Sequence, residues 1–199
     1  MTFNIGLIIN PLAGLGGSVA LKGSDDVASE ALALGAIPKA NARCLQALAE
    51  VATLDVCVYA FGGDMGADCA LSAGLKTEVV GKAKTQPSSA ADTISAAQML
   101  LTQGVDLLVF VGGDGTARDL LSAIGDQVPV VGIPAGVKIH SGVYGITPLA
   151  AGQVIAQLIR GELVSLRSQE VRDIDEQEFR AGRVKARYYG ELQVPESHQ

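Results

Sequence analysis

One short segment of the sequence has the residue types and spacing of a phosphoryl-transfer site. The apolar run 105–110 leads into Gly112, Gly113 and Gly115, which surround Asp114. Glycines let the backbone turn tightly and approach a ligand, and the N–H groups of the loop and of the following helix favour an anion. A carboxylate there would repel a bare phosphate, so it should hold a bridging metal ion or take the proton of an attacking hydroxyl. The sequence therefore predicts Asp114 as a catalytic residue and metal ligand.

Asp114 and Thr116 each have a second interpretation from local geometry. An aspartate in a turn often bonds its own backbone, and a threonine at a helix start often caps the helix. The glycines on both sides of Asp114 favour its catalytic interpretation. A carboxylate in a glycine turn is expected to contribute little to packing. Thr116 is expected to cap the helix, and its hydroxyl could also face a phosphate.

The first predicted strand also ends in a loop suited to phosphate. Asn10 precedes Pro11, so its amide could hold the next loop or bond a nucleotide phosphate. Gly14, Gly16 and Gly17 would let the backbone approach a phosphate closely, or would be flexible turn residues. The loop lacks both the Gly-Lys-(Ser/Thr) sequence of common ATPases and the third glycine of the dinucleotide fingerprint.

Two further loops hold candidate ligand contacts. A second Gly-Gly-Asp sequence ends at Asp64, which either contacts ligand or lies in a turn that closes the crevice wall. Gly136 and Lys138 follow another predicted strand, where Lys138 would match phosphate oxygens or remain solvated. Ser141 is expected to shape the same loop and contribute to the site. A lone histidine such as His140 is more often structural or exposed.

Apolar, β-branched segments alternate with helical segments along most of the chain. We expect strands over 3–10, 55–60, 77–80, 106–111 and 128–133, and helices over 40–53, 67–73, 90–103, 116–124 and 148–160. This alternation predicts an α/β fold with a parallel sheet covered by helices on both faces. Ligands of such sheets sit beyond the carboxyl ends of the strands. Asn10, Gly112, Asp114 and the 136–138 loop are therefore expected to line one pocket.

The last stretch of the chain departs from this pattern. Residues 162–174 have extended character, and 184–194 alternate weakly between apolar and polar residues. An isolated edge strand would expose unpaired backbone donors and acceptors. We therefore expect 184–194 to pair with 162–174, to add to a neighbouring subunit, or to be partly disordered.

Composition and charge narrow the class of protein. Of the 199 residues, 48% are hydrophobic and 18% charged, with 24 glycines, which fits an α/β domain and excludes disorder. The net charge of −6 argues against nucleic acid or an anionic membrane as the main partner. The three cysteines lack metal-ligand spacing and, without a signal peptide pattern, predict reduced thiols in a cytoplasmic protein.

The glycine-rich segments resemble those of a known superfamily. Gly-Gly-Asp-Gly-Thr after an apolar strand resembles the signature of NAD kinases, diacylglycerol and sphingosine kinases, and 6-phosphofructokinases. Residues 7–17 resemble the first strand and Asn-Pro-x-(Ala/Ser)-Gly loop of this superfamily. Residues 132–144 resemble the ATP-NAD kinase branch, and more closely the predicted polyphosphate/ATP-dependent NAD kinases related to acetoin-catabolism protein X. The resemblance covers roughly residues 4 to 194.

The resemblance implies a fold, a domain organisation and an activity. It implies a 6-phosphofructokinase/NAD kinase-like nucleotide-binding domain over 1–161, and over 162–199 a linker and the first strands of a β-rich second domain on which the chain ends. ATP or polyphosphate would bind with Mg²⁺, and the 2′-hydroxyl of the adenosine ribose of NAD would attack the donor phosphate to give NADP. A homo-oligomer is implied as well. The alternatives are a kinase for a lipid or small metabolite, and a nucleotide-binding accessory protein without catalysis.

Overall fold

The protein is an α/β domain built on a central parallel sheet. A computed structural model describes residues 2–15, 35, 37–136, 139–163, 165–174, 178 and 181–196. Five parallel strands form the sheet in the order β3-β2-β1-β4-β5. Its strands are β1 (Phe3–Ile9), β2 (Val56–Phe61), β3 (Lys76–Gly81), β4 (Leu107–Gly112) and β5 (Val130–Pro134). The predicted fold class is confirmed, because the strands alternate with helices along the chain as expected.

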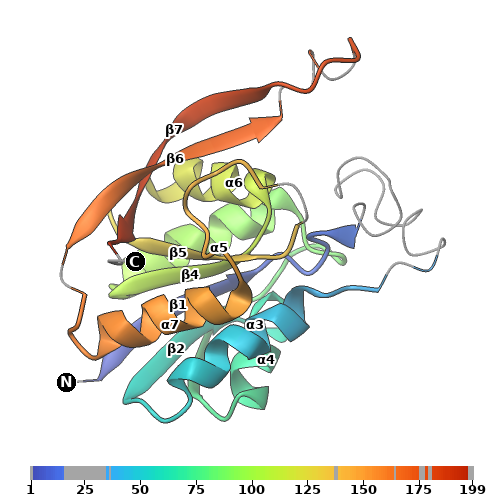
Figure 1. Cartoon of the computed structure of the whole chain (residues 1–199). Coiled ribbons are helices and arrows are strands. Elements are labelled where there is room, and N and C mark those ends of the chain that lie inside the picture. Colours follow the sequence, from blue (N-terminus) through green and yellow to red (C-terminus); the bar gives the residue numbers. More distant parts are fainter. Residues whose placement is uncertain are drawn as a thin grey trace.

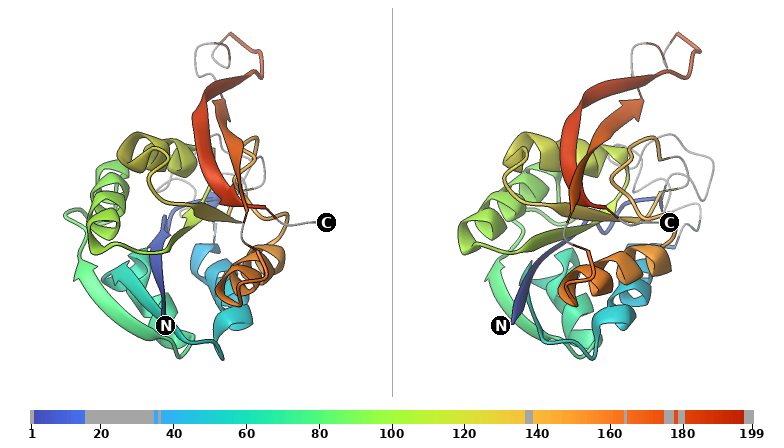
Figure 2. Two further views of the ribbon diagram at one scale, coloured as in Figure 1. Left: turned by 90° about the vertical axis from the view of Figure 1, so that its left-hand side faces the viewer. Right: turned by 60° about the vertical axis from the view of Figure 1, so that its left-hand side comes forward.

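Helices cover both faces of the sheet (Figure 1, Figure 2). One face carries α3 (Ala40–Leu48), which continues into the 3₁₀ turn η1 (Ala49–Val51), together with α4 (Ala67–Ser72) and α7 (Pro148–Ile159). The opposite face carries α5 (Ala90–Gln103) and α6 (Asp114–Ile124). A second 3₁₀ turn, η2 (Gly63–Met65), follows β2. Burial on both faces explains why the central strands are almost wholly apolar.

The alternation of side chains along each strand divides the core into two layers. In β1, Ile5 and Leu7 pack toward α3 and α7, whereas Ile8 packs toward α5 and α6. In β4, Val109 belongs to the first layer and Phe110 to the second. Successive residues of a strand point to opposite faces, so each strand supplies both layers.

Local sequence signals set several of the helix ends. Ser89 and Asp92 form a capping box at the start of α5, and Thr147 caps α7 by accepting a hydrogen bond from the amide of Ala150. The predicted start of α6 at Thr116 is wrong, because the helix begins two residues earlier, at Asp114. Its N-cap is Gly113, which has no side chain to signal the position. Thr116 therefore lies inside the first turn and does not cap the helix.

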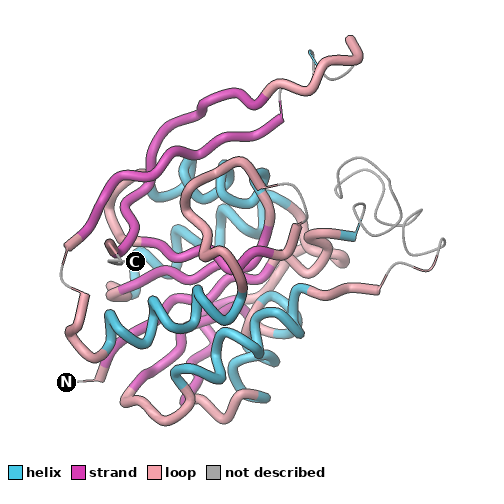
Figure 3. The backbone as a smooth tube through the Cα atoms, in the orientation of Figure 1, coloured by secondary structure: helices cyan, strands magenta, loops and turns pink. Residues whose placement is uncertain are grey.

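The segments after α7 form an antiparallel hairpin. This is one of the three expected arrangements, in which 184–194 pairs with 162–174. Strand β6 (Leu166–Ile174) pairs with β7 (Ala186–Pro195) and the hairpin rests on α6, with its far end projecting beyond the helices (Figure 1, Figure 3). Val171, Leu192 and Val194 bury themselves in the same core layer as α5 and α6. The hairpin is thus anchored to the α/β domain through its inner face.

A close helix contact gives a test of this packing. Gly152 in α7 lies against α3, and a Cβ built there would overlap the carbonyl oxygen of Ala47 and approach its Cα to 2.9 Å. Both obstructing atoms belong to the backbone, so the two helices would have to move apart. In an open helix the change from glycine to alanine would stabilise by about 1 kcal/mol.

We expect Gly152→Ala to lower the free energy of unfolding by about 1–3 kcal/mol, because overpacking outweighs the gain in helix propensity. Urea denaturation followed by circular dichroism measures this change. Gln153→Ala, at an exposed position of the same helix, should change stability by less than about 0.5 kcal/mol. A more stable Gly152→Ala protein would contradict the close contact between α3 and α7.

Candidate functional site

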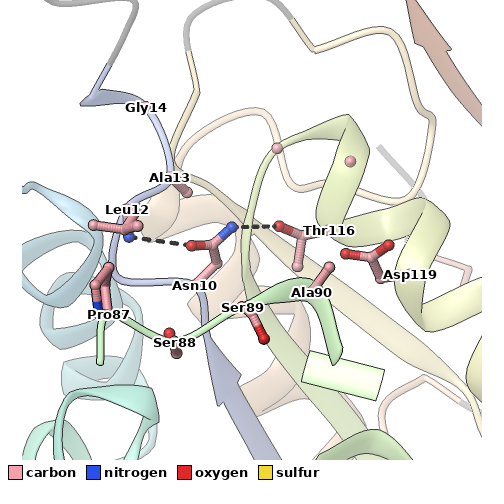
Figure 4. Close-up of a pocket in the computed structure, with 12 residues that line it drawn as sticks. Asn10, Leu12, Ala13, Gly14, Pro87, Ser88, Ser89, Ala90, Thr116 and Asp119 are labelled. Atoms are coloured by element: carbon pink, nitrogen blue, oxygen red, sulfur yellow. Dashed lines mark hydrogen bonds between the residues drawn. The ribbon is translucent and has the colours of Figure 1, made fainter. Parts of the chain in front are cut away.

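The strand order creates a crevice at the centre of the sheet. Strands β1 and β4 are neighbours, but the chain leaves β1 toward the β2–β3 edge and leaves β4 toward the β5 edge. Loops that diverge in this way open a crevice beyond the carboxyl ends of the two strands. A cavity of about 310 Å³ lies at this point (Figure 4). It is lined by Asn10, Leu12, Ala13, Gly14, Pro87, Ser88, Ser89, Ala90, Gly113, Gly115, Thr116 and Asp119.

Two helices begin at the wall of the cavity. Ser89 and Ala90 start α5, while Gly113 and Gly115 start α6. The first backbone N–H groups of a helix have no partner inside the helix, and the helix dipole places partial positive charge there. Among the described residues that line the cavity, none is basic and one is acidic. Among the described lining groups, backbone amides at the helix starts, rather than cationic side chains, are therefore the ones suited to bind an anion.

Asn10 joins the two loops that enclose the cavity. Its Oδ1 accepts a hydrogen bond from the amide of Leu12 at 3.1 Å, and its Nδ2 donates to Oγ1 of Thr116 at 3.2 Å (Figure 4). Its own amide donates to the carbonyl of Val111 at 3.0 Å. Of the two roles expected for the Asn10 amide, this geometry supports that of holding the loop after β1 against α6.

The predicted glycines have different structural roles. Gly112 faces the side chain of Thr116, since a Cβ on Gly112 would overlap the threonine and lie 2.8 Å from its Cγ2. Gly14 adopts φ +80° and packs against the carbonyl of Ala135. A Cβ on Gly136 would lie 4.0 Å from the Cα of Gly113. The loops after β1, β4 and β5 thus converge at one edge of the sheet. Of the described residues expected to line one pocket, Asn10 lines the cavity, whereas Gly112, Asp114 and Gly136 do not.

Asp114 is buried beside this cavity and bonds to the loop after β5. Its Oδ2 accepts from the amide of His140 at 2.8 Å and lies 3.1 Å from Nδ1 of the same residue. Its Oδ1 accepts from the amide of Ser141 at 3.0 Å. Only 7% of Asp114 is exposed. The expectation that this carboxylate contributes little to packing is therefore wrong, because it fastens the start of α6 to residues 26 and 27 positions away.

The same loop holds the peptide on the other side of Asp114. The hydroxyl of Tyr144 donates a hydrogen bond to the carbonyl of Gly113, and its ring packs edge-on against Phe110 with 5.2 Å between the centroids. Burial, and next the negative charges of Asp114 and Asp173, raise the pKa of the Tyr144 hydroxyl well above its ordinary value. The hydroxyl therefore remains protonated and acts as a donor.

The donor set limits how a metal ion could be held. The described residues contain no group of three or more His, Cys, Asp or Glu side chains arranged for a metal. Magnesium commonly takes one or two carboxylates and fills its other positions with phosphate oxygens and water. Asp119 at the cavity wall and Asp114 beside it fit that kind of site, with the oxygens of Asp114 already accepting amide hydrogen bonds.

Several predicted site residues lie apart from the cavity. Asp64 is exposed in η2 and does not line it. Arg118 of α6 forms a 3.2 Å ion pair with Asp173 of β6. Predicted contacts that fall outside the described residues are those of Gly16, Gly17 and Lys138.

Sequence reasoning missed the contribution of the segment before α5. Residues 87–90 line the cavity, and Asp92 organises them by accepting hydrogen bonds from the amides of Lys84 and Ser89 and from the hydroxyl of Thr85, at 2.6 to 3.0 Å. These hydrogen bonds hold the pKa of Asp92 well below the ordinary carboxyl range, and the bond from the Thr85 hydroxyl contributes most. The Ser-x-x-Asp spacing of Ser89 and Asp92 is typical of a helix start. A helix start that follows a parallel strand is the sequence signal that could have found these residues.

Comparisons with known proteins place the chain in a family. A model of the ATP-NAD kinase N-terminal domain matches residues 5–163. A crystal structure of a diacylglycerol kinase from Bacillus anthracis str. Sterne matches with a TM-score of 0.41 and 17% identity, over 86% of this chain and 43% of that protein. A second crystal structure from that strain, also assigned as a diacylglycerol kinase, matches with a TM-score of 0.43 and 15% identity, over 85% of this chain and 44% of that chain. This chain thus spans less than half the length of either structure.

No curated protein sequence matched this one. Within the part of the chain that the structure describes, no helix is both long and apolar enough to cross a membrane.

The bonds of Asp92 lead to a prediction about acid stability. A carboxylate whose pKa is depressed on folding stabilises the protein above its unfolded pKa and loses that effect as the pH falls toward its folded pKa. We expect Asp92→Asn to lower the melting temperature at pH 7, and the difference from wild type to shrink below about pH 4. Thermal unfolding at pH 7, 5 and 3.5 measures this. The exposed Asp126→Asn serves as control, and a constant difference at all three pH values would contradict the role of the ionised carboxylate.

Proposed function

This chain belongs to the family of ATP-NAD kinase N-terminal domains, and on that premise we propose that it is the nucleotide-binding domain of a phosphotransferase with an alcohol acceptor. The observation that carries the proposal is the cavity between β1 and β4. The starts of α5 and α6 and the glycine loop around Gly113 meet there. Such a wall of backbone N–H groups suits the phosphates of a nucleotide.

We propose NAD as the acceptor and ATP, or polyphosphate, as the donor. The 2′-hydroxyl of the adenosine ribose would attack the terminal phosphate of the donor, and the product would be NADP. The amides of Gly115 and Thr116 would stabilise the charge that develops on the phosphoryl oxygens. Bound Mg²⁺ would neutralise charge on the donor phosphates, with Asp119 or Asp114 as its protein ligand.

Asp114 is the proposed acceptor of the hydroxyl proton. Its Oδ1 accepts one amide bond, from Ser141, and a carboxylate oxygen can accept two. The remaining acceptor position can orient an incoming hydroxyl, while the amides of His140 and Ser141 fix the plane of the carboxylate. Orientation of this kind is the main contribution of a protein to phosphoryl transfer.

A panel of donors and acceptors tests the proposal directly. The purified protein is incubated with Mg²⁺ and either ATP or polyphosphate, with NAD, NADH, diacylglycerol or a sugar as acceptor, and products are identified by mass spectrometry. NADP formation supports the proposal, and comparison of the two donors identifies the phosphate source. A different phosphorylated product would retain the kinase but replace its acceptor. ATP binding without any product would favour the accessory, non-catalytic alternative.

A substitution separates catalysis from binding. We expect Asp114→Asn to lower turnover at least about 10²-fold, since it removes the proposed proton acceptor, while calorimetry shows ATP affinity changed much less. The asparagine side chain also places an NH₂ donor where a carboxylate oxygen accepted a hydrogen bond, so the melting temperature of the variant is measured as well. Asp64→Asn is the matched control, because it alters the second Gly-Gly-Asp sequence at an exposed position away from the cavity. Near-normal turnover in Asp114→Asn would rule out the catalytic role.

A further inference from the structure

Ser141 connects the β6–β7 hairpin to the loop after β5. Its side-chain hydroxyl donates to the carbonyl of Arg172 at 2.8 Å and accepts from the amide of Arg172 at 2.9 Å. Next to it, the amide of Gly142 donates to the carbonyl of Glu170 at 2.9 Å. The hydroxyl thus occupies the place of a backbone partner for the edge of β6. With 7% of Ser141 exposed, this hydroxyl is used within the protein.

The backbone of the same residue bonds to the proposed catalytic carboxylate. The amide of Ser141 donates to Oδ1 of Asp114 at 3.0 Å, and the preceding amide of His140 donates to Oδ2 at 2.8 Å. One residue therefore contacts β6 through its side chain and Asp114 through its main chain. Strand β6 and the carboxylate are therefore linked through the hydroxyl and the amide of one residue.

The hairpin is also tied to α6, the helix that Asp114 begins. Arg118 pairs with Asp173 of β6 at 3.2 Å. Farther along the helix, Leu121 fits against Gly190 of β7, where a Cβ would approach the leucine Cδ2 to 2.8 Å. The hairpin therefore contacts α6 directly and contacts its first residue indirectly through Ser141. This arrangement fixes the hairpin and the carboxylate relative to each other.

We propose that Ser141 is a positioning residue that couples the β6–β7 hairpin to Asp114, so that the placement of the hairpin sets the orientation of the carboxylate toward the acceptor hydroxyl. This inference rests on the proposed function and deepens it. It gives the hairpin, which lies beyond the residues matched by the family model, a part in the reaction. Ser141, predicted from the sequence as a ligand contact, acts on the ligand through Asp114.

Removal of the hydroxyl tests the coupling. We expect Ser141→Ala to lower kcat with NAD and ATP about tenfold with KM for ATP unchanged, because misplacing a reacting group by about 1 Å costs up to about 10²-fold. Ser141→Thr keeps the hydroxyl and should restore most of the loss. Ser168→Ala, which removes an exposed β6 hydroxyl bonded to Gln193, is the matched control and should leave kcat unchanged. An unchanged kcat in Ser141→Ala would overturn the coupling.

A measurement without turnover keeps the two proposals distinguishable. In amide hydrogen exchange, Ser141→Ala should speed exchange about tenfold at Arg172, which loses its acceptor, and also at His140, whose acceptor is Asp114. Faster exchange at Arg172 alone would overturn the coupling, even if the wild-type protein phosphorylates NAD. An inactive wild type with faster exchange at both amides would overturn the proposed function and support the coupling.

A second variant covers the case in which Ser141→Ala does not fold. Asp173→Asn weakens the ion pair with Arg118 on the half-exposed surface beside Arg172, so it should loosen β6 without opening the core. We expect a several-fold loss of kcat, again with KM for ATP unchanged, and faster exchange at His140. Normal kcat and normal exchange at His140 would overturn the coupling.

Discussion

The hydrogen bonds of the Asp114 carboxylate are the interaction on which the candidate site depends. A carboxylate that is nearly removed from water needs donors, and here the amides of His140 and Ser141 supply them. Those amides belong to the loop after β5, while the carboxylate belongs to the first turn after β4. These hydrogen bonds join the segments that follow β4 and β5, and so fix the two segments relative to each other at the edge of the crevice.

The cavity presents backbone amides at helix starts, rather than cationic side chains, among its described lining groups. Its walls are made of helix starts, small residues and one carboxylate, and the described lining residues include no lysine or arginine. Amide groups at fixed positions favour phosphate oxygens without the strong, non-directional field of a cationic cluster. The net charge of −6 for the chain is consistent with the proposal that amide groups at fixed positions hold the phosphates and that a bound metal ion would neutralise their remaining charge.

The fold followed from the sequence because the strands are buried on both faces and the glycines mark their ends. Roles that depend on distant neighbours did not follow. Gly112 was expected to admit a ligand, and no local signal showed that its missing side chain also makes room for Thr116. Thr116 was expected to cap α6, but a glycine precedes the helix and leaves no side-chain signal. Asp114 was expected to contribute little to packing, because the sequence around it gives no sign of hydrogen-bond donors that lie 26 and 27 residues away.

Ser141 shows why one residue in such a loop can have a chemical role without touching a ligand. Its hydroxyl completes the edge of β6 and its amide completes the shell of Asp114. Both bonds are made by one residue of the segment between β5 and α7, so a displacement of that residue would affect both. A carboxylate that must be aligned with a hydroxyl to within tenths of an ångström gains from such a rigid link. The hairpin's attachment to α6 through Arg118 and Leu121 then makes its position part of the geometry of the site.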